Sequence, residues 1–358
     1  MTAGPFLTLA WAEVAAVDGG RPEAQRLCVR MEGADAPAKA LAYPAFCGGP
    51  IGVGERVLLN TTACDLGLGS GGFHLVVAVA GRTPVRHEPG HIVKLRYTPL
   101  QIAVRAAAEP GMPGHPALAA ARSLHGMPVV AGSLHAQVAP AVIACHLTAP
   151  ALRVAYVMTD GGALPAALLD EVHELRHAGV LTAVISCGHA FGGDLESVSL
   201  PGALMAARHI AGCHVAIAAM GPGAVGTATA WDTSALEMAA ILDCTAGLGG
   251  RPLAMARVSF ADARRRHHGV SHHTRTALGL VRSPALLAAP PGTLAALLRE
   301  AVARERHTVV EVGDDSLFAA VRAALPGHRT MGRGWDLEGP LFRVAAAAGA
   351  LAAGIAQA

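Results

Sequence analysis

The most unusual chemical feature of this 358-residue chain is a histidine- and arginine-rich segment, Arg264-Arg-Arg-His-His-Gly-Val-Ser-His-His-Thr274. Ser271 can cap a following helix and so place His272 and His273 in its first turn, where the helix dipole keeps imidazole neutral. Neutral imidazole binds metals or moves protons, whereas arginine suits an anion. A solvated basic loop without function stays an alternative. The segment supplies one catalytic candidate, His272, and four candidate anion ligands: Arg266, His268, Ser271 and His273.

Four carboxylates and one further histidine are candidates for acid–base or metal chemistry. We expect His189 or His272 to act as a general acid or base, with Asp160, Asp194 or Asp262 orienting it. Carboxylate oxygens and imidazoles also suit a divalent metal, which would be the cofactor. The predicted metal ligands are His189, Asp194 and Glu196. The carboxylates could equally be helix caps, a role that needs no function.

A glycine-rich stretch after a predicted strand could hold a phosphate or carboxylate. Gly221, Gly223 and Gly226 satisfy the pattern GxGxxG, and Thr227 follows them. Glycine lets the backbone approach an anion near a helix N-terminus. A dinucleotide is disfavoured, because the stretch follows an internal strand and no acidic residue ends the next strand about 20 residues on. A tight structural turn is the alternative.

Further side chains follow other predicted strands. Ser133 and His135 come directly after a strand at residues 128–132, which makes them candidate ligands. Cys187 lies two positions before His189 and invites a nucleophile interpretation, but most such cysteines are buried packing residues.

The elements that must position these residues alternate between apolar strands and helices from about residue 128 onward. Strands that are apolar throughout and separated by helices predict a doubly wound, mostly parallel sheet covered on both faces. Ligands of such sheets bind beyond the carboxyl ends of the strands. The predicted strands are Pro128 to Gly132, Arg153 to Met158, Thr182 to Ser186, His214 to Met220, Pro252 to Val258 and Thr308 to Val312.

The first hundred residues differ from the rest. Short apolar segments between residues 6 and 80 are broken by turn residues every eight to twelve positions, which predicts a small antiparallel β-barrel or sandwich. The predicted organisation is therefore a β domain at 1–100, a connection at 101–127 and an α/β domain at 128–358.

Composition restricts the function classes. The chain has 28 Lys and Arg, 26 Asp and Glu and 18 His, a formal net charge of +2, which argues against nucleic-acid binding. No apolar stretch resembles a membrane span, and the Ala-rich run at Val344 to Ala356 predicts a buried helix or an interface between copies of the chain. Seven scattered cysteines without a CxxC pair fit a reducing cytoplasm.

Several long motifs resemble those of a bacterial family catalogued as a domain of unknown function. They include GHIVKLRYTPLQ from Gly90, GHAFGGDLE from Gly188, MGPG from Met220, SFAD from Ser259, RHHGVSHH from Arg266 and TMGRG from Thr330. The resemblance covers essentially the whole chain and implies that the loops act as a unit, but it supplies no activity. The chain departs from the family at Ala228, where the family more often has glycine.

Two functions follow as expectations. The first is an enzyme, a hydrolase or transferase, that acts on a small phosphate- or carboxylate-bearing molecule by acid–base or metal-assisted chemistry. The second is a non-catalytic ligand-binding or regulatory protein whose β domain docks a partner. Either could form a homo-oligomer.

Overall fold

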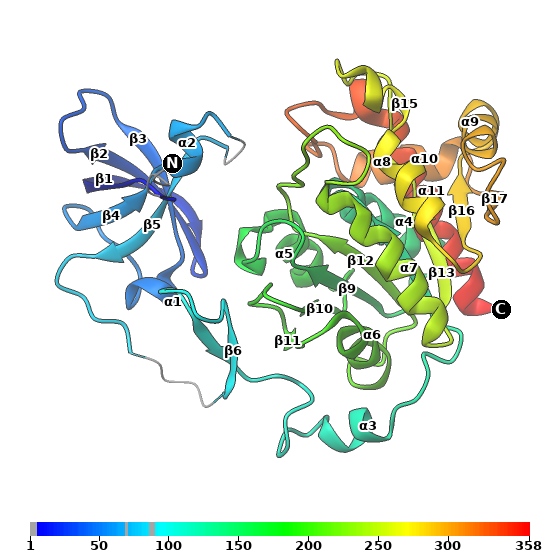
Figure 1. The fold of residues 1–358 in the computed structure, drawn as a ribbon, viewed down its shortest axis with the longest axis horizontal. Helices are drawn as coiled ribbons and strands as arrows, with labels where there is room; N and C mark the ends of the chain where they lie inside the picture. The colour runs from blue at the N-terminus through cyan, green and yellow to red at the C-terminus, as the bar shows by residue number, and fades with distance from the viewer. Residues whose placement is uncertain (1–5, 69–70, 86–89) are drawn as a thin grey trace. The chain divides into compact units, whose positions relative to one another are not determined.

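The computed structural model describes residues 6–68, 71–85 and 90–358. The chain divides into two compact units, residues 1–88 and 89–358 (Figure 1). Each unit is described by itself.

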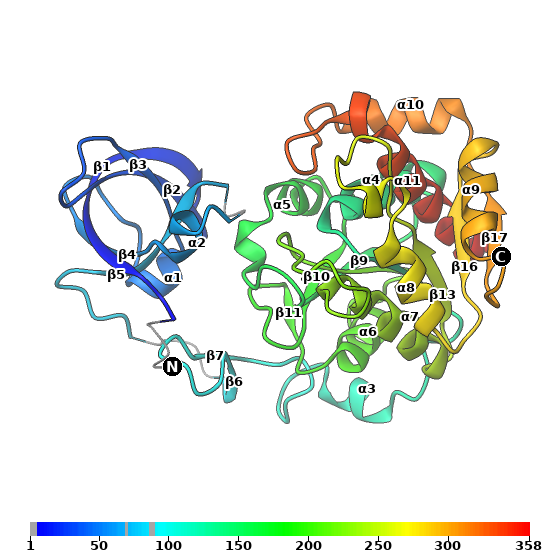
Figure 2. The ribbon, with the colours of Figure 1, turned by 45° about the horizontal axis from the view of Figure 1, so that its top comes forward.

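The first unit is a closed barrel, as the turn spacing predicts. Its strands are β1 (Leu9–Arg21), β2 (Ala24–Met31), β3 (Ala38–Ala42), β4 (Arg56–Asn60) and β5 (Phe73–Val79), joined in the order β1-β2-β3-β5-β4. The strands curve into a ring (Figure 2). Neighbouring strands are antiparallel except β3 and β5, which are parallel. Inward-facing side chains such as Val14, Leu27 and Leu59 fill the interior, while short helices α1 (Pro44–Cys47) and α2 (Thr62–Asp65) follow β3 and β4.

The second unit begins earlier than predicted. An antiparallel pair, β6 (Ile92–Lys94) and β7 (Ile102–Val104), precedes α3 (His115–Ala120) and belongs to this unit. The reason is a long-range contact: the buried side chain of Lys94 donates to the Ser186 and Ala190 carbonyls and pairs with Glu196 at 2.6 Å. That contact fixes the hairpin to the sheet, so residue 100 is not a boundary.

An eight-stranded parallel sheet forms the centre of the described part of this unit, in the order β11-β10-β9-β12-β8-β13-β16-β17. The strands are β8 (Pro128–Gly132), β9 (Val154–Thr159), β10 (Ala183–Ser186), β11 (Leu195–Glu196), β12 (Val215–Met220), β13 (Arg251–Met255), β16 (Leu286–Ala289) and β17 (Thr308–Glu311). Between β13 and β16 the chain forms a small antiparallel ribbon of β14 (Val258–Ser259) and β15 (Gly269–Val270).

Helices cover both faces of the sheet, as the apolar strands predict (Figure 1). Alternate residues of one strand enter different cores: Val130 of β8 packs with one set of helices, and Val129 and Ala131 pack with the other. The first set is α4 (Val138–Thr148), α5 (Asp170–His177), α10 (Asp315–Ala324) and α11 (Trp335–Gln357). The second set is α6 (Leu200–His209), α7 (Glu237–Gly247) and α8 (His272–Leu280). A smaller cluster holds α9 (Thr293–Ala301) beside β16.

The Ala-rich C-terminal helix α11 is a core element of its own unit. By length and composition it could cross a membrane, but 61% of its most apolar stretch is buried, as in the core helix of a soluble protein. Gly349 faces the backbone of Ala141 in α4, where any Cβ would collide. Small residues therefore allow the two helices to pack closely. Of the two alternatives predicted for the Ala-rich run, the buried helix is the one that this packing shows.

Candidate functional site

A cluster of three histidines lies where the β14–β15 ribbon meets the start of α8. His267 ends a short 3₁₀ turn before β15, and His272 and His273 occupy the first turn of α8. One ligand nitrogen from each ring can be chosen so that all three lie within 4.8 Å of one another. The ring centroids are 4.3–5.0 Å apart. The sequence predicted roles for His272 and His273, but His267 was not among the predicted site residues.

Local hydrogen bonds bring the three rings together. The Ser271 Oγ accepts the His273 N–H at 3.2 Å and caps α8, which confirms the predicted cap. The same oxygen lies 2.8 Å from His267 Nδ1. Arg257 lies just after β13. Its backbone carbonyl accepts the Ser271 N–H, and its backbone N–H donates to the Thr274 hydroxyl. The end of β13 therefore fixes the start of α8, and Ser271 orients His267.

Two ring nitrogens of this cluster are buried and have no hydrogen-bond partner among the described residues. They are His272 Nε2 and His273 Nδ1. Buried polar atoms are nearly always satisfied, so two unsatisfied atoms in one cluster indicate a place for a ligand. The Ser271 bond to one nitrogen of His267 is the kind of outer-shell contact that orients a metal-binding ring.

The three imidazoles are neutral at neutral pH. Burial, reinforced by nearby arginines, lowers the pKa of His267 to about 3 and that of His273 to about 4. Burial and Arg266 also lower the pKa of His272. The neutral state predicted from the sequence is therefore present, and burial contributes more to it than neighbouring positive charge. A neutral imidazole has a lone pair to offer a metal.

A frame of arginines and carboxylates surrounds the cluster. Asp262 pairs at 2.8 Å with both Arg257 and Arg264, and Arg333 pairs with Glu338 at 2.6 Å. Arg333 also lies 3.9 Å from Asp262, so the two pairs form one network. The Arg264 hydrogen bond, with help from Arg257, holds the pKa of Asp262 well below its usual range. Asp262 is therefore a fixed carboxylate that orients arginines, and it does not carry a proton near neutral pH.

Ser133 and His135 lie at the neighbouring strand end. Gln137 ties their loop to the end of β13, since its amide donates to the Met255 and Ala256 carbonyls at 3.1 Å and accepts from the Ser133 N–H. Ser133 Oγ and His135 Nδ1 are buried without a partner in the described structure, and burial lowers the pKa of His135 to about 4. Both residues stay predicted ligands.

The predicted set of His189, Asp194 and Glu196 is not brought together as a metal site. Asp194 pairs with Arg176 and accepts the Val184 N–H, which places it at the start of β10 and not at its carboxyl end. Glu196 is held by Lys94 and accepts the Ser186 hydroxyl at 2.8 Å. His189 Nδ1 accepts the Leu95 N–H at 3.0 Å. Each of these groups has a structural partner, and the described residues that could hold a metal are the three clustered histidines.

Asp160 remains at the carboxyl end of β9. Its carboxylate accepts the His189 N–H at 2.9 Å, so it holds the turn after β10 instead of the His189 ring. Cys187 is buried, and burial raises the pKa of its thiol to about 12, which fits the packing interpretation.

The glycine stretch after β12 does not lead directly into a helix. Gly226 pairs with Thr233, and Thr227 N–H donates to the Asp232 carbonyl, so the loop folds back on itself well before α7. Gly221 lies against the Ala163 carbonyl, where a Cβ would collide. Close packing explains why residue 221 is a glycine. No helix begins at Gly223 or Thr227, so the helix N-terminus that we expected to hold an anion is absent there. Ala228 has φ +69°, a conformation that favours glycine.

Glu237 is a half-buried carboxyl that the sequence did not single out. It begins α7 and accepts the Thr159 hydroxyl at 2.5 Å. Burial, with a contribution from the Asp160 charge, raises its pKa to about 7. The available signal was an acidic residue in the apolar helical segment that follows the glycine-rich stretch.

The raised pKa of Glu237 predicts a pH-dependent stability. Between about pH 4.5 and pH 7 the folded protein keeps a proton that the unfolded chain releases, so stability falls as pH rises through this window. Above pH 7 the free energy of unfolding is lower by about 3 kcal/mol, because each unit of pKa difference between the folded and unfolded states contributes about 1.4 kcal/mol. The Glu237→Gln variant lacks this titration. Urea unfolding at pH 5 and pH 8 should show wild type losing about 2.5 kcal/mol more than the variant between the two pH values. Parallel pH profiles for both proteins would contradict the assignment.

The fold and the cluster define a protein with a closed β-barrel and an α/β unit that carries three neighbouring histidines. The chain belongs to the family described as Protein of unknown function (DUF3866), whose model matches residues 39–349. Comparison with curated proteins and with solved structures gives no match. The predicted resemblance to a family of unknown function is thus confirmed, and function must be argued from the site.

Proposed function

We propose that residues 89–358 form a metal-dependent enzyme that acts on a small phosphate- or carboxylate-bearing substrate at His267, His272 and His273. The observation that carries the proposal is the set of three neutral imidazoles whose ligand nitrogens lie within 4.8 Å of one another, two of the rings bearing buried nitrogens without partners. Three protein ligands are typical of catalytic zinc sites, which keep a fourth position for water or substrate.

The chemistry of the donors favours a transition metal. Imidazole suits Zn²⁺, Cu²⁺, Ni²⁺ and Fe²⁺, whereas Mg²⁺ and Ca²⁺ prefer oxygen. A bound Zn²⁺ would lower the pKa of a coordinated water and so supply a nucleophile near neutral pH. The protein's own contribution is to hold three rings in the neutral state and to orient His267 through Ser271.

The surrounding charge favours an anionic substrate. Arg266 is exposed beside His267, and Arg257 and Arg264 contribute positive charge that their shared partner Asp262 only partly offsets. The N-terminus of α8 adds a partial positive charge at the same place. A metal ion raises this charge further, so a negatively charged substrate or hydroxide would balance it.

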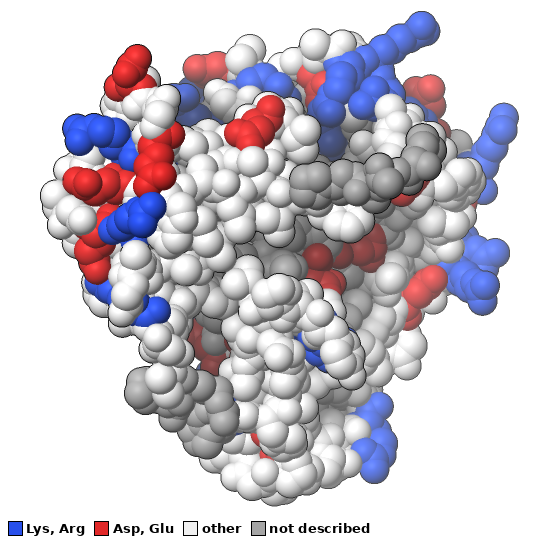
Figure 3. Space-filling view, turned by 60° about the vertical axis from the view of Figure 1, so that its left-hand side comes forward, with Lys and Arg blue, Asp and Glu red and all other residues white. Residues whose placement is uncertain are grey.

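A small molecule suits the chain's formal net charge of +2 better than a nucleic acid. On the face drawn in Figure 3, Lys and Arg side chains stand in separate groups among uncharged residues and carboxylates. Nucleic-acid binding normally uses a continuous basic surface. The cytoplasm stays the expected compartment, because Cys47, Cys145, Cys187 and Cys213 are buried thiols and not disulfides.

The enzymatic proposal is tested by turnover of two anionic esters. The full-length protein, loaded with one Zn²⁺ per chain, is incubated with p-nitrophenyl phosphate and with mono-p-nitrophenyl succinate. We expect release of p-nitrophenolate from one of them, abolished by a chelator and by His272→Ala but retained in His177→Ala, which changes an exposed histidine of α5. Stoichiometric metal without turnover of either ester would overturn the enzymatic proposal and favour the non-catalytic ligand-binding protein.

A further inference from the structure

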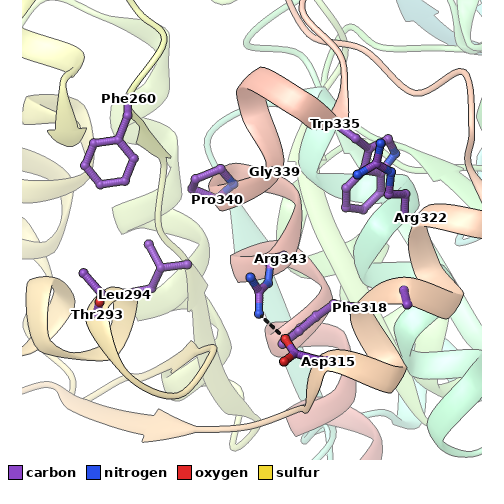
Figure 4. A pocket seen from close by; sticks show the side chains of 11 residues that line it. Phe260, Thr293, Leu294, Asp315, Phe318, Arg322, Trp335, Gly339, Pro340 and Arg343 are labelled. Carbon is purple, nitrogen blue, oxygen red and sulfur yellow. Dashed lines mark hydrogen bonds and ion pairs between the residues drawn. The ribbon is translucent and has the colours of Figure 1, made fainter.

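A cavity of about 550 Å³ lies between α10, the first turns of α11 and the start of α9. None of the three clustered histidines lines it. Its volume is within the range of small-molecule sites, which are typically apolar with a few polar groups that orient the ligand. Figure 4 shows Phe260, Thr293 and Leu294 on one side of α11 and Phe318, Trp335 and Arg322 on the other.

The walls are mainly apolar and aromatic. Phe318 and Trp335 are both buried side chains whose rings contribute to the lining. The indole N–H of Trp335 already donates to the Leu325 carbonyl at 2.8 Å, so its polar atom is satisfied. Its ring packs against Phe342, with the ring centroids 4.9 Å apart, and also lines the cavity. Pro340 lines the cavity where α11 resumes after a break at Glu338. These walls suit a flat or aliphatic body.

One cationic group has unused hydrogen-bonding capacity at this cavity. The Arg343 guanidinium lies 4.7 Å from the centre of the Phe318 ring, and one of its Nη atoms contacts Asp315 at 2.9 Å (Figure 4). Its Nε is buried and has no partner in the described structure. Asp315 is 98% exposed, so this ion pair is weak and an anion of a ligand can compete for the guanidinium.

A second arginine has an equally weak partner. Arg322 lines the cavity and pairs at 2.7 Å with Asp336, whose side chain is 85% exposed. Two arginines with exposed partners thus border an aromatic cavity, and Arg343 is stacked on one of its rings. Guanidinium binds carboxylate and phosphate through paired N–H donors, which a stacked and therefore oriented group can offer with little loss of freedom.

We propose that this cavity is a second ligand site, separate from the histidine cluster, for an amphipathic anion with an apolar ring or chain and one carboxylate-like or phosphate-like head. The apolar body packs on Phe318 and Trp335, and the head accepts hydrogen bonds from Arg343. The site does not depend on metal and does not depend on the proposed enzymatic activity.

The probe is 8-anilinonaphthalene-1-sulfonate, which joins an aromatic body to one anionic head and fluoresces when bound. Titration of the full-length, metal-free protein should show one saturable site per chain. The uncharged analogue N-phenyl-1-naphthylamine should bind at least 10-fold more weakly. The Arg343→Gln variant should weaken binding of the anionic probe at least 10-fold, and Arg343→Lys, which keeps the charge, should weaken it less.

The matched control is Arg299→Gln on α9, an exposed arginine paired with Glu311 outside the cavity. It should bind the probe within 2-fold of wild type. Equal binding by Arg343→Gln and wild type, or equal weakening by Arg299→Gln and Arg343→Gln, would overturn the proposal. Zinc content measured in the same variants is expected to stay at the wild-type level, so failure of this site and failure of the histidine site give different results.

Discussion

Replacing His273 with alanine is expected to lower the affinity of the protein for Zn²⁺ by more than 100-fold. The substitution removes one of three nitrogens that lie within 4.8 Å of one another and leaves a site with two protein ligands. Loss of an outer-shell partner alone commonly costs 10- to 100-fold in metal affinity, and loss of a direct ligand costs more. Competition with a chromophoric chelator measures the affinity directly.

His268→Ala is the matched control for this experiment. His268 is exposed, is adjacent in sequence to His267, and packs its ring against Phe260 instead of joining the cluster. Its zinc affinity should stay within about 3-fold of wild type, a change of less than 1 kcal/mol. Wild-type affinity in His273→Ala, or equal losses in both variants, would show that the cluster does not bind the metal.

Asp262→Asn is expected to lower the free energy of unfolding by about 3–5 kcal/mol, the usual cost of removing one partner from a buried ion pair. The side chains of Asp262 and Arg257 are only 3% and 5% exposed, so the variant leaves the Arg257 charge buried without its counterion. Arg264 also loses its carboxylate partner. Urea unfolding of the full-length protein, followed by circular dichroism, measures the change.

The control for the stability experiment is Asp315→Asn, which breaks the exposed pair with Arg343. Exposed ion pairs contribute about 0–1 kcal/mol, so this variant should unfold close to wild type. If Asp262→Asn were as stable as Asp315→Asn, the network around the histidines would not hold the site together.

The architecture was largely predictable because its strands carry strong local signals. β8 and β12 are apolar at every position and β9 is apolar up to its last residue, Thr159, as expected for a sheet covered on both faces. β11 was missed because it has two residues, too few to show a strand pattern. β16, Leu286–Ala289, was missed because an Ala- and Leu-rich run has no strand period. The strand predicted at residues 252–258 is divided in the structure into β13 and the first strand of the short ribbon, β14. No local sequence signal marks the break between them.

The site was predictable only in part, because its contacts join distant residues. The Ser271 cap is a local pattern, and it correctly placed His272 and His273 in the first turn of a helix. Inclusion of His267 depends on the chain reversal between β14 and β15, which spacing does not specify. The pairing of Lys94 with Glu196 joins residues 102 positions apart, and no motif revealed that it would occupy a predicted metal ligand.

The most direct test of the account is X-ray absorption spectroscopy at the zinc edge on the full-length protein loaded with one Zn²⁺ per chain. We predict three imidazole nitrogens at about 2.0–2.1 Å and one further oxygen or nitrogen ligand. The imidazole signal should fall in His267→Ala, His272→Ala and His273→Ala. A zinc ion bound by oxygen or sulfur ligands, or an imidazole signal unchanged in all three variants, would contradict the assignment of a metal centre to this cluster.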